Sequence, residues 1–246
     1  MKNKQLVVIQ HVEREGPGLF ADVAKERGFS IKLVSLCKGD KLISPNRSQV
    51  YLFLGGPMGI SDLGNDNYPW LSKEVKLIQD LFKLNIPMLG ICLGAQLIAY
   101  AAGGGIRPLF DSVKNKYTPE LGWLPISFIS NNLCPFNVFE EPFYVLHWHG
   151  DQILLPNSAT LLASSMRCKE QMYKIGNKIY GLQFHLETIN NDIFKWLEED
   201  SEFVMKAYGD NFREILIQQE LEHGTSSLQK RKQLIRILLD EISMSD

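Results

Sequence analysis

Residues 86–105, with the sequence IPMLGICLGAQLIAYAAGGG, pass from a continuous apolar run to a helical pattern. The apolar run at residues 86–91 predicts a short strand that is buried on both faces. The segment LGAQLIAYAA predicts a helix, which ends at the three consecutive glycines 103–105. A buried strand followed directly by a helix is typical of a parallel sheet that helices cover on both faces.

The same alternation of strands and helices precedes this segment. Apolar runs and helical spacing predict, in order, a strand at Leu6–Gln10, a helix at Leu19–Gly28, strands at Ile31–Leu36 and Val50–Gly56, and a helix at Trp70–Leu84. After Gly105 the apolar runs are shorter and separated by tight turns, which predicts a small set of antiparallel strands. We therefore expect a flavodoxin-like α/β fold with a mostly parallel sheet and helices on both faces.

From Asn190 onward the pattern is helical. We expect one domain over residues 1–190 and a helical C-terminal extension over residues 191–246. The last predicted helix has an apolar face formed by Leu228, Ile235, Leu238, Leu239 and Ile242. The basic run at residues 230–232 on the same helix favours a solvent-exposed face over the alternative, a contact patch for a partner.

The composition excludes several classes of protein. The 246 residues include 26 Lys and Arg against 28 Asp and Glu, a net charge of −2, so we expect no nucleic-acid partner. No apolar run reaches the roughly 18 residues of a membrane span, and the N-terminal residues predict a strand rather than a secretory signal. Cys37, Cys92, Cys134 and Cys168 have no CxxC spacing, which indicates neither a disulfide framework nor a cysteine zinc site. We expect a cytoplasmic protein without a membrane partner.

The turn between the strand at residues 86–91 and the following helix carries a cysteine. Gly90, Cys92 and Gly94 give the pattern G-x-C-x-G, which is that of a nucleophile elbow with cysteine in place of serine. Only small residues two before and two after the nucleophile avoid collisions in such a sharp turn. The helix then points its amino end at the sulfur, which should favour the thiolate and lower the pKa of Cys92. The alternative is a buried cysteine in a glycine-rich turn.

A nucleophile needs a base, and the base needs a group that orients it. His185 ends an apolar run, and Glu187 follows two residues later, so extended backbone would place both side chains on one face. A carboxylate at that position would hold the imidazole in one tautomer. The alternative is a histidine and a glutamate exposed at the end of a strand.

A glycine-rich turn at Gly55-Gly56-Pro57 directly follows another predicted strand. Adjacent glycines allow backbone amides to approach a reacting carbonyl group closely. With the amide of Leu93, this turn would form an oxyanion hole. Taken alone, the pattern favours an ordinary Gly-Pro turn.

Together these motifs resemble the class I glutamine amidotransferases, over roughly residues 5–190. The family has a G-G-P turn, a G-x-C-x-G-x-Q elbow and a closing Q-[FY]-H-P-E. In this sequence they stand at Gly55–Pro57, Gly90–Gln96 and Gln183–Glu187, with Leu186 where many members have proline. The segment His149–Asp151 is similar to one in the amidotransferase half of guanosine monophosphate synthetase. The opening His11-Val12 and Glu15–Gly18 resemble stand-alone members.

The resemblance implies a role for each of these residues. Cys92 would attack the side-chain amide of glutamine, His185 would carry the thiol proton to the leaving ammonia, and Glu187 would orient His185. The amides of Gly56 and Leu93 would hold the oxyanion of the tetrahedral intermediate. Gln96 would position the glutamine. Neither a cofactor nor a metal is implied, and the ammonia acceptor would be a synthetase on a separate chain, unless the enzyme acts alone.

Two other functions remain open from the sequence. A γ-glutamyl peptidase would use the same Cys92 site on peptides such as glutathione, and both reactions pass through the same thioester. A catalytically silent binding protein would keep the fold to regulate a partner, although an intact Cys92, His185 and Glu187 favour an enzyme.

Two further patterns are weaker. Gly16, Gly18 and Ala21 fit the spacing of a dinucleotide-binding turn, but five residues separate them from the preceding strand, where that motif needs an immediate turn. His147 and His149 share one face of a predicted strand, with Asp151 beyond them, as at the start of a metal site. No further ligand is evident from the sequence, so we expect no metal.

Overall fold

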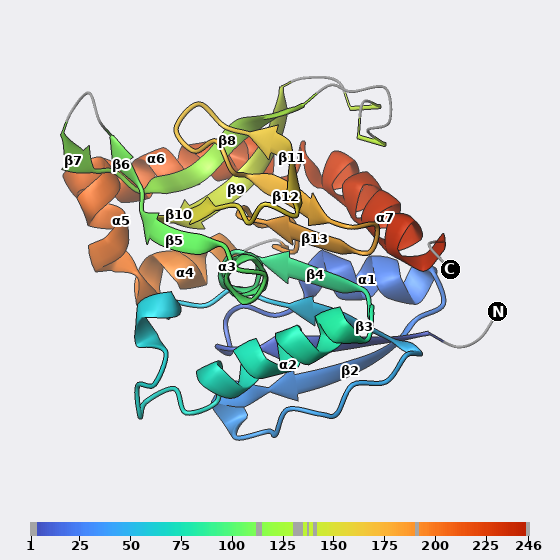
Figure 1. Ribbon diagram of the computed structural model, residues 1–246. Helices are drawn as coiled ribbons and strands as arrows, with labels where there is room; N and C mark the ends of the chain where they lie inside the picture. Colours follow the sequence, from blue (N-terminus) through green and yellow to red (C-terminus); the bar gives the residue numbers. More distant parts are fainter. Residues whose placement is uncertain are drawn as a thin grey trace.

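The computed structural model describes residues 4–111, 115–129, 135, 136, 138, 139, 142–189 and 192–244. These residues contain a nine-stranded sheet in the order β2-β1-β3-β4-β13-β12-β11-β8-β9 (Figure 1). Its parallel half consists of β2 (Ser30–Ser35), β1 (Gln5–Gln10), β3 (Gln49–Phe53), β4 (Met88–Ile91) and β13 (Ile179–Leu182). Its antiparallel half consists of β12 (Met172–Ile175), β11 (Ala159–Ser164), β8 (Glu120–Phe128) and β9 (Phe143–His149). Cys134 and Asn190 lie outside the described residues.

Helices cover both faces of the parallel half (Figure 1). On one face lie α1 (Gly18–Glu26) and α7 (Leu228–Met244), and on the other lie α2 (Leu71–Lys83) and α3 (Leu93–Ala101). Alternate residues of β1 enter different cores, because successive side chains of a strand point to opposite faces. Leu6 and Val8 pack toward α1 and α7, whereas Val7 and Ile9 pack toward α2 and α3. The expected α/β fold with a mostly parallel sheet and helices on both faces is confirmed.

Smaller elements surround the carboxyl end of the sheet. Two short antiparallel pairs are β10 (Asp151–Leu154) with β5 (Gly105–Pro108) and β6 (Phe110–Asp111) with β7 (Lys116–Tyr117). The helices α4 (Asp192–Glu199), α5 (Ser201–Tyr208) and α6 (Phe212–Gln219) contribute apolar side chains to a third core with β8 and β9. Short helical turns lie at Leu36–Lys38 (η1), Ile60–Asp62 (η2), Gly209–Asn211 (η3) and Glu220–Gly224 (η4). None of the described helices is long and apolar enough to cross a membrane.

The last helix, α7, is part of the main core. The apolar face expected from the sequence is buried, since Ile235, Leu238, Leu239 and Ile242 belong to the same cluster as Leu6 of β1. Packing of α7 against α1 therefore covers one face of the parallel sheet. The division of the chain into residues 1–190 and residues 191–246 stays a prediction.

The expectation of a solvent-exposed basic face on α7 is wrong for Arg231. Its side chain is buried, and its guanidinium donates hydrogen bonds to the backbone carbonyls of Leu186, Thr188 and Gly224 at 3.1, 2.7 and 3.0 Å. Burial lowers the pKa of Arg231 to about 10, which still leaves it charged at neutral pH. Arg231 thus fixes the backbone on both sides of Glu187. The basic run around Arg231 in the sequence does not predict this contact.

Candidate active site

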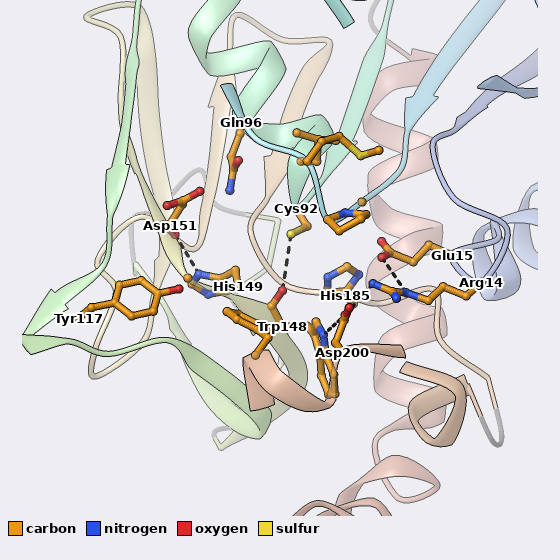
Figure 2. Close-up of a pocket in the computed structure, with 16 residues that line it drawn as sticks. Arg14, Glu15, Cys92, Gln96, Tyr117, Trp148, His149, Asp151, His185 and Asp200 are labelled. Atoms are coloured by element: carbon orange, nitrogen blue, oxygen red, sulfur yellow. Dashed lines mark hydrogen bonds and ion pairs between the residues drawn. The ribbon is translucent and has the colours of Figure 1, made fainter. Parts of the chain in front are cut away.

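A cavity of about 290 Å³ lies where the segments following β1, β3, β4 and β13 come together (Figure 2). It is lined by Arg14, Glu15, Gly56, Pro57, Met58, Cys92, Leu93, Gln96, Tyr117, Trp148, His149, Gly150, Asp151, His185, Asp200 and Phe203. Of the residues singled out from the sequence, the cavity brings together Cys92, His185, Gly56, Leu93 and Gln96. Glu187 does not line the cavity and lies behind His185.

Cys92 stands in a strained turn between β4 and α3. Its backbone φ of 49° and ψ of −107° lie outside the regions that residues other than glycine normally adopt. A Cβ atom on Gly90 would lie 2.6 Å from backbone atoms of Gly94 and Ala95, and one on Gly94 would collide with the carbonyl of Phe53. Both glycines are therefore required by the close approach of the turn to its neighbours. A sharp strand-to-helix turn is what the spacing of residues 90–94 predicts, and the role of Cys92 as a nucleophile stays a prediction.

The elbow leads to a prediction about stability. Gly94→Ala should lower the free energy of unfolding by at least about 4 kcal/mol or prevent folding, because the backbone of β3 cannot move away without breaking the sheet. Gly16→Ala is the matched control, since the nearest atom to a Cβ added at Gly16 would be the flexible end of Gln10, at 4.0 Å. Denaturant unfolding of both variants measures the difference, and equal stabilities would contradict the argument.

His185 and Glu187 form a buried pair. The distance between Nδ1 of His185 and Oε1 of Glu187 is 2.6 Å, and both side chains are 2% exposed. The ring packs edge-on against Trp196 of α4, and the backbone amide of His185 donates to the carbonyl of Leu146 in β9 at 2.8 Å. Because the carboxylate of Glu187 binds Nδ1, Nε2 is the remaining ring nitrogen. It has no hydrogen-bond partner among the described residues.

Cys92 and His185 influence each other's ionisation. Burial raises the pKa of the Cys92 thiol, and the nearby ring of His185 opposes this rise. Burial alone would lower the pKa of His185, but Glu187 and Cys92 together raise it well above its ordinary value. The expectation of a lowered pKa for Cys92 is therefore wrong, because burial of the sulfur outweighs the stabilisation of the thiolate. Formation of the thiolate then depends on proton transfer to His185.

A second buried histidine holds the glycine turn after β3. Nδ1 of His11 lies 2.9 Å from the carbonyl oxygen of Gly55, and its Nε2 lies 2.9 and 3.1 Å from the carboxylate oxygens of Glu74 in α2. Both partners can only accept hydrogen bonds, so the ring carries a proton on each nitrogen. Burial alone would lower the pKa of His11, but the carboxylate of Glu74 outweighs burial and raises it. His11 therefore fixes the peptide between Gly55 and Gly56.

The segment Glu15–Gly18 packs against the His185–Glu187 pair. The amide of Leu19 donates to the backbone carbonyl of Glu187 at 2.9 Å, and a Cβ on Gly18 would collide with the same carbonyl. Gly18 is thus required by the close approach of α1 to Glu187. The side chain of Glu15 is buried beside the His185 ring, and burial raises its pKa while His185 and Arg14 oppose the rise.

Sequence reasoning missed the contribution of the C-terminal helices to the cavity. The guanidinium of Arg14 lies 2.6 Å from Asp200 and 2.9 Å from Glu199, both at the junction of α4 and α5. Asp200 also accepts a hydrogen bond of 2.9 Å from the indole of Trp148, and Figure 2 labels Arg14, Trp148 and Asp200 among the residues that line the cavity. No local pattern links Arg14 to residues so far along the chain, so only the structure could reveal this part of the cavity.

Gln96 lies on α3 one turn after the elbow and is buried at the cavity. Its amide nitrogen is 3.4 Å from the side-chain oxygen of Gln183, whose own amide nitrogen lies 3.6 Å from the sulfur of Cys92. The sulfur also lies 3.9 Å from the carbonyl oxygen of Trp148 (Figure 2). Gln96 and Gln183 thus form a polar pair beside the sulfur.

Comparison with known proteins identifies the family. The family model described as glutamine amidotransferase class-I matches residues 19–198, which include the elbow and the His185–Glu187 pair. The chain belongs to this family.

Individual relatives agree with the match. YfeJ, a glutamine amidotransferase-like protein of Salmonella typhimurium, is 27% identical over 243 residues, which is 96% of each chain. One of the subunits of the glutamine-hydrolyzing GMP synthase of Saccharolobus solfataricus is 35% identical over 142 residues, 55% of this chain and 65% of that protein. The crystal structure of a glutamine amidotransferase from Thermotoga maritima has a TM-score of 0.81 and 31% identity over the full length of both chains.

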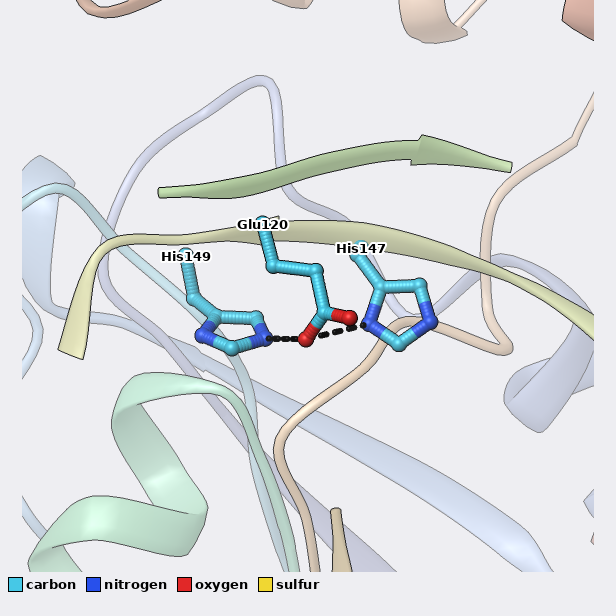
Figure 3. Close-up of side chains that lie close together, drawn as sticks. All are labelled: Glu120, His147 and His149. Carbon is cyan, nitrogen blue, oxygen red and sulfur yellow. Dashed lines mark ion pairs between the residues drawn. The ribbon is translucent and has the colours of Figure 1, made fainter. Parts of the chain in front are cut away.

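One buried group in this class I amidotransferase has the composition of a metal site. Glu120 of β8 lies beside His147 and His149 of β9 (Figure 3). The sequence pointed to both histidines but suggested Asp151 as their neighbour. Strand pairing instead brings Glu120 to them, since Glu120 stands opposite His149 in the register of β8 and β9. Asp151 contributes only its backbone carbonyl, which lies 3.0 Å from Nδ1 of His149.

Proposed function

We propose that this protein hydrolyses the side-chain amide of glutamine through a γ-glutamyl thioester on Cys92, releasing glutamate and ammonia. The observation that carries the proposal is the buried His185–Glu187 pair, which leaves Nε2 of His185 at the same cavity as the sulfur of Cys92. Membership of the class I amidotransferases supports the choice of a glutamine amide.

The proposed reaction begins with proton transfer. His185 takes the thiol proton of Cys92, and the thiolate attacks the amide carbonyl carbon of glutamine. The tetrahedral intermediate collapses when the imidazolium gives its proton to the departing ammonia, and a thioester remains. Water, activated by the neutral imidazole, then attacks the thioester and releases glutamate with the regenerated thiol. Glu187 stabilises the imidazolium in both halves of the cycle.

The amides of Gly56 and Leu93 are the proposed oxyanion donors. Leu93 is the first residue of α3, where backbone amides have no partner within the helix. In a trans peptide the carbonyl and the following amide point in opposite directions. Because His11 binds the carbonyl of Gly55, the amide of Gly56 is directed away from His11, and Gly56 lines the cavity. The His11–Glu74 pair therefore positions one donor without touching the substrate.

This positioning gives a second prediction. Glu74→Gln removes the carboxylate that keeps His11 doubly protonated, so the peptide of Gly55 should lose its fixed orientation. We expect kcat to fall roughly tenfold, less than the 10²–10³-fold typical when an oxyanion donor is removed, with little change in KM. Asp80→Asn is the matched control, because Asp80 is an exposed acidic residue on the same helix. An unchanged kcat in Glu74→Gln would rule out this role.

Glutamate release from the purified chain tests the proposed activity. Incubation with glutamine should release glutamate and ammonia in equal amounts. If glutathione is cleaved and glutamine is not, the protein is a γ-glutamyl peptidase. If neither substrate is turned over and a glutamine-analogue electrophile does not label Cys92, the proposal fails. Because one relative is part of a GMP synthase built from separate subunits, we propose a synthetase on a separate chain as the ammonia acceptor.

A further inference from the structure

The buried group formed by Glu120, His147 and His149 takes no part in the proposed hydrolysis. One donor atom of each residue lies within 4.8 Å of the others, and all three residues are buried. Glu120 and His149 face each other across the β8–β9 pair, and His147 lies two residues before His149 on the same strand face. The pairing of two strands therefore holds the three side chains together.

The separations between the donor atoms suit a bound ion. Oε2 of Glu120 lies 3.5 Å from Nδ1 of His147 and 3.3 Å from Nε2 of His149 (Figure 3). Charge-assisted N–H···O hydrogen bonds are shorter, at about 2.7–2.9 Å. Ligand atoms bound tetrahedrally at about 2.1 Å from an ion lie about 3.4 Å from one another. Both measured separations match this distance between two ligand atoms.

The hydrogen-bond partners around the group differ between the two histidines. Nδ1 of His149 faces the carbonyl oxygen of Asp151, which only accepts, so in the neutral ring Nε2 carries the lone pair. The side-chain amide nitrogen of Gln171 donates to Oε2 of Glu120 at 2.6 Å and lies 3.4 Å from Nε2 of His149, so an ion bound by these two atoms displaces that amide. Histidine ligands of metals characteristically donate their other ring N–H to a carbonyl or carboxylate. The side chain of His147 is completely buried, and neither of its ring nitrogens makes a well-aligned hydrogen bond with a described residue. A buried polar group without a partner is costly.

We propose that Glu120, His147 and His149 bind a divalent transition-metal ion of the Zn²⁺ type. Two imidazole nitrogens and one carboxylate oxygen form a donor set that Zn²⁺ accepts, whereas Mg²⁺ and Ca²⁺ prefer oxygen ligands. The ion supplies the partner that His147 lacks. It also ties β8 to β9 beside the active-site cavity, which His149 helps to line. This inference departs from the expectation of no metal and is independent of the proposed hydrolysis.

The test measures zinc binding in the Cys92→Ala background, because Cys92 and His185 are themselves potential zinc ligands. After equilibrium dialysis against ZnCl₂, mass spectrometry of the metal content should find one zinc per chain. At a hundredfold excess over the dissociation constant, the melting temperature should rise by roughly 5 °C or more. Adding His147→Gln or Glu120→Gln should weaken binding at least about tenfold. His223→Gln is the matched control, since His223 is a histidine of η4 that is not part of the group.

Absence of stoichiometric zinc, or zinc affinity that is unchanged by both His147→Gln and Glu120→Gln, would overturn the proposal. If the variants do not fold, Co²⁺ bound to the Cys92→Ala protein decides the question. The visible spectrum of a four-coordinate Co²⁺ site without a thiolate charge-transfer band supports the proposed ligands. The spectrum of hydrated Co²⁺ contradicts them.

Discussion

Cys92→Ala should lower the rate of glutamate release from glutamine by at least about 10⁴-fold, the largest effect that we expect. Removal of the nucleophile from a coupled catalytic site leaves only the rate supported by the oxyanion donors and by substrate binding. Folding should be preserved, because alanine is smaller than cysteine and the turn glycines remain. Turnover is measured as glutamate formed per enzyme molecule, with folding verified by thermal unfolding.

The control for this variant is Cys37→Ala. Cys37 is exposed, and its sulfur contacts only the hydroxyl of Ser35 at 3.3 Å among the hydrogen bonds of the described chain. Its replacement should leave turnover unchanged. Substantial glutamate release by Cys92→Ala would remove the Cys92 thioester from the mechanism. Loss of glutamate release in Cys37→Ala would show that the effect is not specific to Cys92.

Glu187→Gln should lower kcat roughly 10³-fold, the second largest effect. An amide in place of the carboxylate no longer stabilises the imidazolium and does not enforce the tautomer with a proton on Nδ1. The 2.6 Å contact to His185 is buried, so solvent cannot replace the lost charge. Glu13→Gln is the control, because Glu13 is an exposed carboxylate paired with Lys38.

The pH dependence separates this electrostatic role from a merely structural one. Glu187 raises the pKa of His185 in the folded protein, and a site that holds both an imidazolium and a neutral thiol cannot begin the reaction. In the wild type, kcat/KM should therefore rise with pH through a midpoint above 6.5. In Glu187→Gln the imidazolium is less stable, so the midpoint should move to lower pH even though the maximal rate falls. An unshifted midpoint would contradict the proposed role of Glu187.

The regularities that the sequence could reveal are local ones. The sharp turn at residues 90–94 follows from steric limits within five residues. The spacing of two between His185 and Glu187 predicted their contact, although β13 ends at Leu182 and His185 forms only an isolated bridge to Leu146. The strand and helix pattern of the first hundred residues predicted the parallel sheet for the same reason. Each of these inferences depends on covalent geometry and on the period of one element.

Contacts between segments far apart in the sequence could not be predicted from local patterns. The burial of Arg231 depends on α7 packing over the carbonyls near Glu187, and the cavity wall depends on Arg14 meeting Asp200. The pairing of Glu74 with His11 joins α2 to the end of β1. A residue type alone does not say which of many distant partners it will meet.

By itself, the sequence determined the fold class, the family and the order of the three candidate catalytic residues, because these follow from spacing along one chain. Only the tertiary structure decided what surrounds them. It buried the sulfur and so raised the pKa of Cys92, closed the cavity with the C-terminal helices, and placed Glu120 between two histidines. The physical reason is that solvation and charge at a site depend on everything packed around it, and packing joins residues that the sequence keeps far apart.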